Sequence, residues 1–329
     1  MQKKLSKQNN SGFTLSEVLI AVAILIVLMG LAMIPITRHQ RDLRQTELDA
    51  KAEIVYHAAQ NKLSELLANG RISDCYAEDL QPLNNTPLDA AERKTSLHYV
   101  TSAAKTGEGS AAAAILVERE SGRVLYEENA DEKRLIASIT KIMTVLLALE
   151  NCSMDETVTF SENAVFSIER GSSHIARTTD EELTMEQCLY AIMLESANEC
   201  ANAVAEHIAG STEAFADMMN QKAADLGCTN THFVNPHGLH DPEHYTSAHD
   251  MALITQAALK YDKFREIAGT VRYTIPPTNK NENELMMNNH HCMISTYKTS
   301  KYLDSSGFAG KTGFTTDALN TLVTCAHRS

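Results

Sequence analysis

The segment that most limits how this chain can fold is 135–149, which is apolar on nearly every side of a helix. A helix of this kind belongs in a protein core, so other elements have to surround it. Ser138 and Lys141 stand three residues apart near its start, and this spacing places both side chains on one helix face. Burial disfavours the charged form of a lysine, and a neutral amine beside a hydroxyl pairs a base with a nucleophile. The segment therefore predicts a buried helix that carries a reactive serine.

Composition narrows the classes of function. The chain has 329 residues, enough for two domains or for one domain with a large attachment. Its formal net charge of −13 argues against a nucleic-acid-binding surface, which needs clustered lysine and arginine, so no nucleic-acid partner is expected. The 7 cysteines include no C-x-x-C pair, which disfavours a zinc ribbon or a redox motif. Their odd number leaves at least one thiol unpaired within the chain, and the pattern leaves the pairing open.

The N-terminal region has the pattern of a membrane anchor. The apolar run 13–36 is as long as the ~20 residues that a helix needs to cross a bilayer. Glu17 interrupts it near its start, and a carboxylate at such a position is costly and is usually paired or functional. A secretory signal peptide is the alternative, but the run is long and no A-x-A-like cleavage site follows it. Basic residues flank both sides to a similar extent, so the positive-inside rule leaves the orientation open.

The sequence around this carboxylate resembles a known processing site. Residues 12–17 read Gly-Phe-Thr-Leu-Ser-Glu, which resembles the cleavage site of type IV prepilins and pseudopilins. The resemblance implies that a prepilin peptidase cuts after Gly12 and that the new amine of Phe13 is methylated. It also implies that Glu17 pairs with the terminal amine of a neighbouring pilin-like subunit. Because apolar residues recur at near-helical spacing further on, we expect three N-terminal parts: a leader over 1–12, a transmembrane helix over 13–36 and a helical stalk over 37–70.

Helical periodicity fades after this stalk. Residues 71–108 are expected to form a linker, and a Lys-Thr-Gly triplet at 105–107 lies in it without strand-forming neighbours. The segments 111–118 and 123–127 flank a Glu-Ser-Gly turn and predict a β-hairpin. A catalytic domain is expected over 109–329, beginning with this hairpin.

Two further triplets fit a reaction at the serine. Residues 196–198 read Ser-Ala-Asn between an apolar segment and a second helical stripe, so we expect them at a turn where they can relay a proton. Residues 311–313 read Lys-Thr-Gly among further glycines, which let a backbone approach a ligand, and the lysine supplies positive charge. The segments 295–298 and 161–163 fit the same patterns, but the first lies in polar surroundings and the second has the pattern of a helix cap.

The three motifs occur in the order S-x-x-K, S-x-N and K-T-G, and together they form a specific signal. The segment 109–329 resembles the low-molecular-weight penicillin-binding proteins, the serine D-alanyl-D-alanine carboxypeptidases. Further matching text is GRVLY at 122–126, NPHGL at 235–239 and GKTGFT at 310–315. The resemblance implies an α+β, β-lactamase/transpeptidase-like fold, in which an antiparallel sheet packs against a helical subdomain. It also implies a last strand and a closing helix beyond Ser329, so we expect a C-terminally truncated domain with two unpaired sheet edges.

The resemblance implies a role for each motif. Ser138 attacks the carbonyl between the two terminal D-alanines of a peptidoglycan pentapeptide stem, Lys141 takes its proton, and Ser196 passes a proton to the departing D-alanine. The positions that bind substrate are Asn198, Lys311, Thr312, Gly313 and Phe314. The backbone N–H groups of Ser138 and Phe314 form the oxyanion hole. β-Lactams acylate the same serine, and no cofactor is needed. Anchor and domain together imply a single-pass protein of the cytoplasmic membrane, with its catalytic domain on the extracytoplasmic face.

Alternatives stay open beside this interpretation. The second hypothesis is a pilin-like structural subunit that carries an inactive enzyme-like head. A class A β-lactamase is less favoured, because no E-x-x-L-N motif with a deacylating glutamate stands between Ser196 and Lys311. One crowded loop invites a zinc site, but the spacing of its histidines matches no compact ligand set, so no metal site is expected at His237, His240, His244 or His249.

Overall fold

The computed structural model describes residues 95–104 and 111–328. The predicted leader, transmembrane helix and stalk lie outside these residues, together with Gly12, Phe13, Glu17 and the triplet at 105–107. Among the described helices, none is both long enough and apolar enough to cross a membrane.

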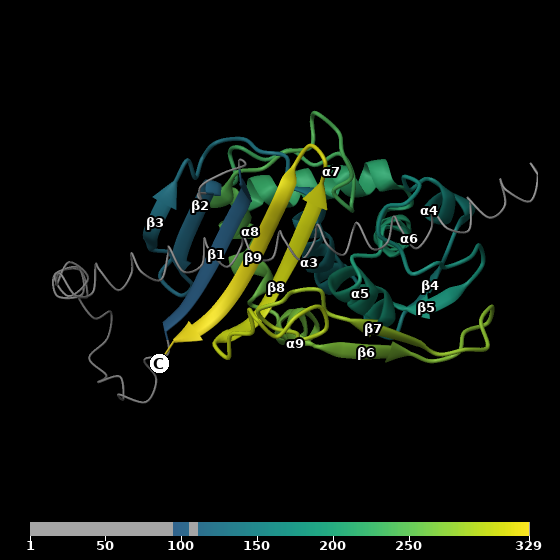
Figure 1. Ribbon diagram of the computed structural model, residues 1–329. Helices are drawn as coiled ribbons and strands as arrows, with labels where there is room; N and C mark the ends of the chain where they lie inside the picture. Colours follow the sequence, from purple (N-terminus) through teal and green to yellow (C-terminus); the bar gives the residue numbers. More distant parts are fainter. Residues whose placement is uncertain (1–94, 105–110, 329) are drawn as a thin grey trace, which may run out of the picture. The chain divides into compact units, whose positions relative to one another are not determined.

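Five of the described strands form one antiparallel sheet (Figure 1). From one edge to the other they are β3 (Val124–Glu128), β2 (Ala111–Glu118), β1 (Thr95–Ala104), β9 (Leu319–Arg328) and β8 (Gly307–Thr315). The hairpin predicted from the sequence is present as β2 (Ala111–Glu118) and β3 (Val124–Glu128). A second hairpin consists of β8 (Gly307–Thr315) and β9 (Leu319–Arg328), and it carries the Lys-Thr-Gly triplet on β8. Strands from both ends of the described chain therefore meet in one sheet.

The strand β1 (Thr95–Ala104) lies between these two hairpins and pairs antiparallel with β2 and with β9. Val100 lies opposite Ile115 on one side and opposite Val323 on the other. This strand corrects the sequence analysis, which placed these residues in a linker over 71–108 and expected two sheet edges without partners. Tyrosine, valine and threonine favour an extended chain here, but the polar residues between them hide any clear apolar alternation. The described sheet is continuous, with β3 and β8 at its edges.

Helices lie against the sheet and extend away from it (Figure 1). Helix α8 (Ala248–Ala258) contacts β1 and β2, α9 (Asp262–Gly269) contacts β8, and α3 (Lys141–Asn151) contacts both helices. The other described elements are α4 (Glu162–Phe166), α5 (Met185–Leu194), α6 (Asn198–Ala209), α7 (Thr212–Asp225), and two small sheets formed by β4 (Thr157–Thr159) with β5 (Glu182–Thr184) and by β6 (Arg272–Ile275) with β7 (Leu285–Asn288). The predicted α+β architecture is confirmed.

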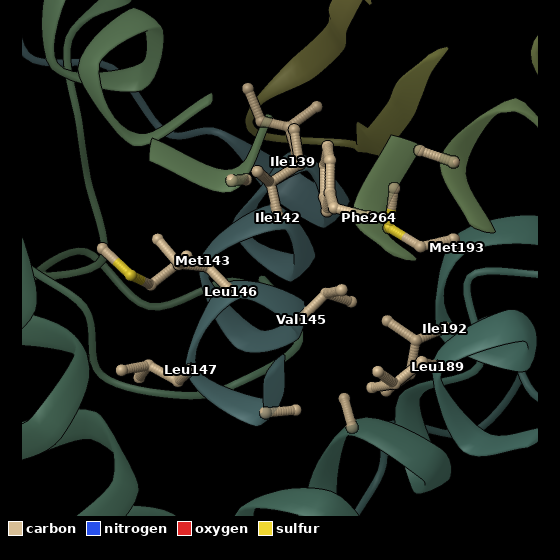
Figure 2. Close-up of a cluster of buried hydrophobic side chains, with 14 of the residues drawn as sticks. Ile139, Ile142, Met143, Val145, Leu146, Leu147, Leu189, Ile192, Met193 and Phe264 are labelled. Carbon is tan, nitrogen blue, oxygen red and sulfur yellow. The ribbon is translucent and has the colours of Figure 1, made fainter. Parts of the chain in front are cut away.

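Helix α3 and the 3-10 turn η1 (Ala137–Thr140) before it form the centre of the core, as the sequence predicted. Every residue of α3 from Lys141 to Ala148 is buried. Figure 2 shows its apolar side chains facing Leu189 and Ile192 of α5 and Phe264 of α9. The helix has no side-chain cap at its start and no charge in its first or last turn that favours the helix dipole. Packing rather than local propensity therefore holds it, with about 1.5–3 kcal/mol from each large apolar side chain that is fully buried.

Candidate active site

Lys141 is the first residue of α3, and its side chain is fully buried. Its Nζ atom lies 3.1 Å from Oγ of Ser138, which is one turn earlier in η1. The same amine donates hydrogen bonds to Oδ1 of Asn198 at 2.7 Å and to the backbone oxygen of His237 at 2.6 Å. The predicted meeting of hydroxyl and amine on one helix face is thus present in the structure.

Burial lowers the pKa of Lys141 well below its usual 10.5, and the positive charge of Lys311 lowers the pKa further. A neutral amine has two N–H groups and one lone pair. The two carbonyl oxygens that face Nζ can only accept, so they take up both N–H groups. The lone pair is then left for the Ser138 hydroxyl, which makes the amine a base for that proton.

The backbone beside the serine is strained and is held from several sides. Ala137 has a φ of 49°, a value that costs a residue other than glycine about 1–3 kcal/mol. Its carbonyl accepts a hydrogen bond from the Thr140 hydroxyl at 2.8 Å, and the preceding Ile136 carbonyl accepts from Thr321 of β9 at 2.7 Å. Gly238 packs against the same Ala137 carbonyl, in a left-handed conformation with a φ of 85°. These contacts fix the direction in which Ser138 points.

His244 supports the same turn. Its Nε2 atom lies 2.8 Å from the Thr140 hydroxyl, and its Nδ1 accepts from the backbone N–H of Val234 at 3.0 Å. Burial lowers the pKa of His244 to about 4, so the ring is neutral at pH 7. Because the Thr140 hydroxyl donates to Ala137, Nε2 carries the proton and donates to the hydroxyl. In the histidine-rich loop, His249 and His240 have other partners, Asp131 and Asp317, so these rings do not form one ligand set.

The Ser-Ala-Asn triplet lies at the predicted turn between α5 and α6. Ser196 is buried and has a φ of 60°, a second left-handed residue at the site. Asn198 begins α6, and its backbone N–H donates to the Ser173 carbonyl at 3.0 Å. This turn therefore connects two parts of the site. Asn198 accepts a hydrogen bond from Lys141 of α3, and Ser196 accepts one from a lysine of the sheet.

Lys311 of β8 is buried, and its Nζ donates to the Ser196 hydroxyl at 3.1 Å and to the Thr312 carbonyl at 2.8 Å. Burial lowers the pKa of Lys311 to about 7, and the charge of Lys298 lowers it as well, while Glu195 opposes the shift. The amine is therefore poised between its charged and neutral forms near neutral pH. A negatively charged group placed beside it stabilises the charged form.

The backbone of β8 runs directly past the serine. A Cβ atom added at Gly313 would lie 2.8 Å from the backbone nitrogen of Ser138 and 2.4 Å from Oγ1 of Thr321. Only glycine fits this approach, and it brings the next residue, Phe314, to the same place. Phe314 is exposed, as expected for a residue at the mouth of a site. Hydrogen bonds therefore join Lys141 to Ser138 and Asn198, and Lys311 to Ser196. Gly313 lies beside Ser138, and Thr312 and Phe314 flank this glycine on β8.

Three participants were missed or misjudged from the sequence. The acceptor on His237 is a backbone carbonyl, which no side-chain pattern reveals. Lys298, from the second S-x-x-K segment, was left out of the site because its surroundings are polar, yet its positive charge lowers the pKa of both Lys311 and Glu195. Glu195 lies directly before the Ser-Ala-Asn triplet and pairs with His290 at 3.0 Å. Its position directly before the Ser-Ala-Asn triplet could have identified this glutamate as a neighbour of the site.

Similar solved structures define the class of fold. The DD-transpeptidase of Streptomyces K15 superposes with a TM-score of 0.56 at 24% identity, over 75% of this chain and 92% of that chain. A D-alanyl-D-alanine carboxypeptidase from Mycobacterium tuberculosis H37Rv superposes with a TM-score of 0.55 at 23% identity, over 76% of this chain and 88% of that chain. The fold is that of the DD-peptidases.

Sequence comparison then identifies the family. Residues 99–329 match the model of the D-alanyl-D-alanine carboxypeptidase family, and the chain belongs to this family. The carboxypeptidase DacF of Bacillus subtilis is 42% identical over 165 residues, which are 49% of this chain and 42% of that protein. DacB2 of Mycobacterium tuberculosis is 30% identical over 229 residues, which are 67% of this chain and 72% of that protein.

Two further findings concern the extent of these matches. The match spans only 42% of the length of DacF and 38% of the length of the Escherichia coli carboxypeptidase DacA. Residues 7–33 match the prokaryotic N-terminal methylation motif, as the resemblance to prepilins implied. This motif supports a membrane-anchored N-terminus.

Proposed function

We propose that this chain is a serine D,D-carboxypeptidase, which removes the terminal D-alanine from the stem peptides of peptidoglycan. One observation carries the proposal: the Lys141 amine lies 3.1 Å from the Ser138 hydroxyl, and two carbonyl oxygens occupy its N–H groups. This arrangement prepares a base and a nucleophile before substrate arrives. Family membership supports the same chemistry.

The first half of the reaction forms an acyl-enzyme. Ser138 Oγ attacks the carbonyl carbon between the two D-alanines while Lys141 takes the hydroxyl proton. Negative charge develops on the carbonyl oxygen, and the backbone N–H groups of Ser138 and Phe314 stabilise it. The close approach of Gly313 to the Ser138 nitrogen supports this oxyanion hole.

The C–N bond then breaks, and the departing amine needs a proton. Ser196 supplies it and takes in exchange the proton that Lys141 accepted from Ser138, so that Lys141 is neutral again. Lys311 stays charged, and its 3.1 Å contact from Nζ to Ser196 Oγ holds that hydroxyl in place. Lys311 and Thr312 bind the carboxylate of the leaving D-alanine, and Asn198 holds both the substrate and Lys141. In the last step water attacks the ester carbonyl while neutral Lys141 takes a proton from it. The bond to Ser138 Oγ then breaks, the shortened peptide leaves, and Lys141 passes that proton to Ser138. A β-lactam forms an ester with the same serine. Its leaving amine is part of the opened ring and stays bonded to the acyl group.

The two lysines predict a bell-shaped pH dependence of acylation by penicillin. The rate rises with pH on the acid side because Lys141 reacts in its neutral form, and its pKa lies well below 10.5. The rate falls on the alkaline side because Lys311 attracts the penicillin carboxylate in its charged form, and its pKa is about 7. The second-order rate constant reports the free enzyme and is measured with a fluorescent penicillin. A methyl ester of the same penicillin should lose the alkaline limb; an identical alkaline limb for both would contradict the role of Lys311.

Covalent labelling tests the proposed function. Folded full-length protein in detergent is incubated with fluorescent penicillin, and the labelled peptide is identified by mass spectrometry. We expect a single label at Ser138 in the wild type and none in Ser138→Ala. The variant Ser295→Ala removes the serine of the second S-x-x-K segment and should label normally. Folded wild-type protein that takes up no label would contradict the proposal.

We also propose how the enzyme is held in place. The N-terminal methylation motif supports cleavage after Gly12, methylation of Phe13 and pairing of Glu17 with another pilin-like subunit. A single transmembrane helix over 13–36 and a stalk over 37–70 then hold the catalytic domain outside the cytoplasmic membrane, with a prepilin peptidase as the processing partner. The mass of the mature N-terminal peptide tests this: a methylated Phe13 supports the proposal, and an intact N-terminus at Met1 contradicts it.

A further inference from the structure

A cysteine, a glutamate and a histidine meet on the surface, away from the catalytic serine. Cys152 follows the last residue of α3, Glu156 precedes β4, and His207 lies in the last turn of α6. One ligand atom from each side chain lies within 4.8 Å of the other two. Nε2 of His207 is 2.9 Å from Oε2 of Glu156, and Sγ of Cys152 lies within 4.8 Å of both side chains. The residues are half-buried or exposed, so solvent can reach the cluster.

The three donors suit a zinc ion better than the common hard cations. Zinc binds thiolate, imidazole and carboxylate together, whereas calcium and magnesium prefer sites made of oxygen alone. With metal–ligand bonds of about 2.0–2.3 Å, ligand atoms of a tetrahedral site lie about 3.2–3.7 Å apart. The 2.9 Å separation between His207 and Glu156 has to widen slightly, and separations of up to 4.8 Å have to shrink by about 1.1–1.6 Å for such a site. Because none of the three side chains is fully buried, changes of side-chain rotamer can produce shifts of this size.

The backbone around the cluster also favours a cation. Cys152 is at the C-terminal end of α3, and His207 is near the C-terminal end of α6. The carbonyl groups at a helix C-terminus carry partial negative charge, which stabilises a positive ion nearby. Neither lysine nor arginine occupies the last turn of either helix, so these two helix ends leave room for a metal to supply that charge.

We propose that Cys152, Glu156 and His207 bind one Zn²⁺ ion, with water as the fourth ligand. This site differs from the histidine-rich loop, for which the sequence analysis expected no metal. The sequence did not reveal it because the histidine is far from the other two ligands along the chain. Without metal, burial and the charge of Glu156 raise the pKa of Cys152 to about 11, so the thiol is protonated. Zinc binding forms a sulfur–zinc bond and releases that proton to solvent.

The proposed ion would act on structure rather than on the reaction. It joins the far ends of α3 and α6, whose first residues are Lys141 and Asn198, two partners in the active site. Helix α3 has 11 residues and spans about 16 Å, so the ion is too distant to touch substrate. Bound zinc is therefore expected to raise the melting temperature and to leave the chemistry at Ser138 unchanged.

Cobalt titration tests the site directly. Full-length protein in detergent is freed of metal with EDTA, kept reduced with a phosphine, and titrated with Co²⁺. We expect one equivalent to produce a thiolate-to-cobalt charge-transfer band and the intense visible bands of tetrahedral cobalt, which zinc then abolishes. The variants Cys152→Ser and His207→Ala should lose the charge-transfer band, and Glu156→Gln should weaken binding by at least about tenfold.

Matched controls replace residues of the same kind outside the cluster. Cys228→Ser and His249→Ala should keep the cobalt spectrum, because neither lies within the cluster. Zinc should raise the melting temperature of the wild type and of both controls, but not that of Cys152→Ser. No charge-transfer band in folded wild type, or an unchanged band in Cys152→Ser, would overturn the proposal. Penicillin labelling of the metal-free protein separates this result from a failure of the proposed function.

Discussion

A Lys141→Met variant is expected to keep its fold and to lose acylation by penicillin by about 10²–10⁴-fold, the range that a positioned general base contributes. Methionine has a similar length and fills the buried space, but it cannot accept the Ser138 proton. Its thioether also leaves Oδ1 of Asn198 and the His237 carbonyl without their donor, at about 1–3 kcal/mol for each. Removing a buried amine with a strongly lowered pKa offsets part of that loss.

The measurement is the second-order acylation rate, with circular dichroism to confirm the fold. Lys260→Met provides the control, because this lysine is exposed at the end of α8 and faces no part of the site. A folded Lys141→Met protein that is acylated at the rate of the wild type would show that another group takes the serine proton. The proposed mechanism would then need a different base.

A Gly238→Ala variant is expected to lose more than about 4 kcal/mol of stability, which is exceptional for one substitution, together with all acylation. Gly238 has a φ of 85°, and a Cβ added there would lie 1.9 Å from the Ala137 carbonyl oxygen. The methyl group therefore has to displace the residue that precedes Ser138. It also disturbs the neighbouring His237 carbonyl, which holds the Lys141 amine.

A Gly227→Ala variant separates the cost of the left-handed backbone from the cost of the steric clash. Gly227 has a φ of 84°, and an added Cβ would meet nothing within 4 Å. That variant reports the cost of the left-handed conformation alone, about 1–2 kcal/mol. Urea unfolding followed by circular dichroism gives both losses of stability. Equal losses in the two variants would mean that the turn before Ser138 yields to the extra methyl group.

Much of the site could be predicted from the sequence because its residues carry their chemistry in their side chains. Ser138 and Lys141 were found by their spacing and by the apolar helix that follows them. The hairpin of β2 and β3 was found because it is local, with a short turn between two apolar runs. The family resemblance added the roles of the triplets, and the family comparison supports it.

The rest could not be predicted, for physical reasons that differ from case to case. The place of β1 depends on pairing with β9, which follows it by nearly the whole described chain, and local propensity carries no such information. His244 was considered only as a metal ligand, in a group of four histidines whose spacing matches no compact ligand set. Its contact with Thr140 exists only in the fold. Lys298 has the right neighbours for a solvated residue, but tertiary structure places its charge near Lys311.

The position of β1 has a consequence for how the protein matures. Synthesis proceeds from the N-terminus, so β1, β2 and β3 leave the ribosome long before β9 and β8. Until β9 arrives, one side of β1 has no partner, and such an edge invites pairing with other chains. The nascent protein also lacks Lys311 and the backbone that faces Ser138. Reactivity toward penicillin should therefore appear only after the last described hairpin has been translated, so Ser138 stays unreactive while the polypeptide is still being made.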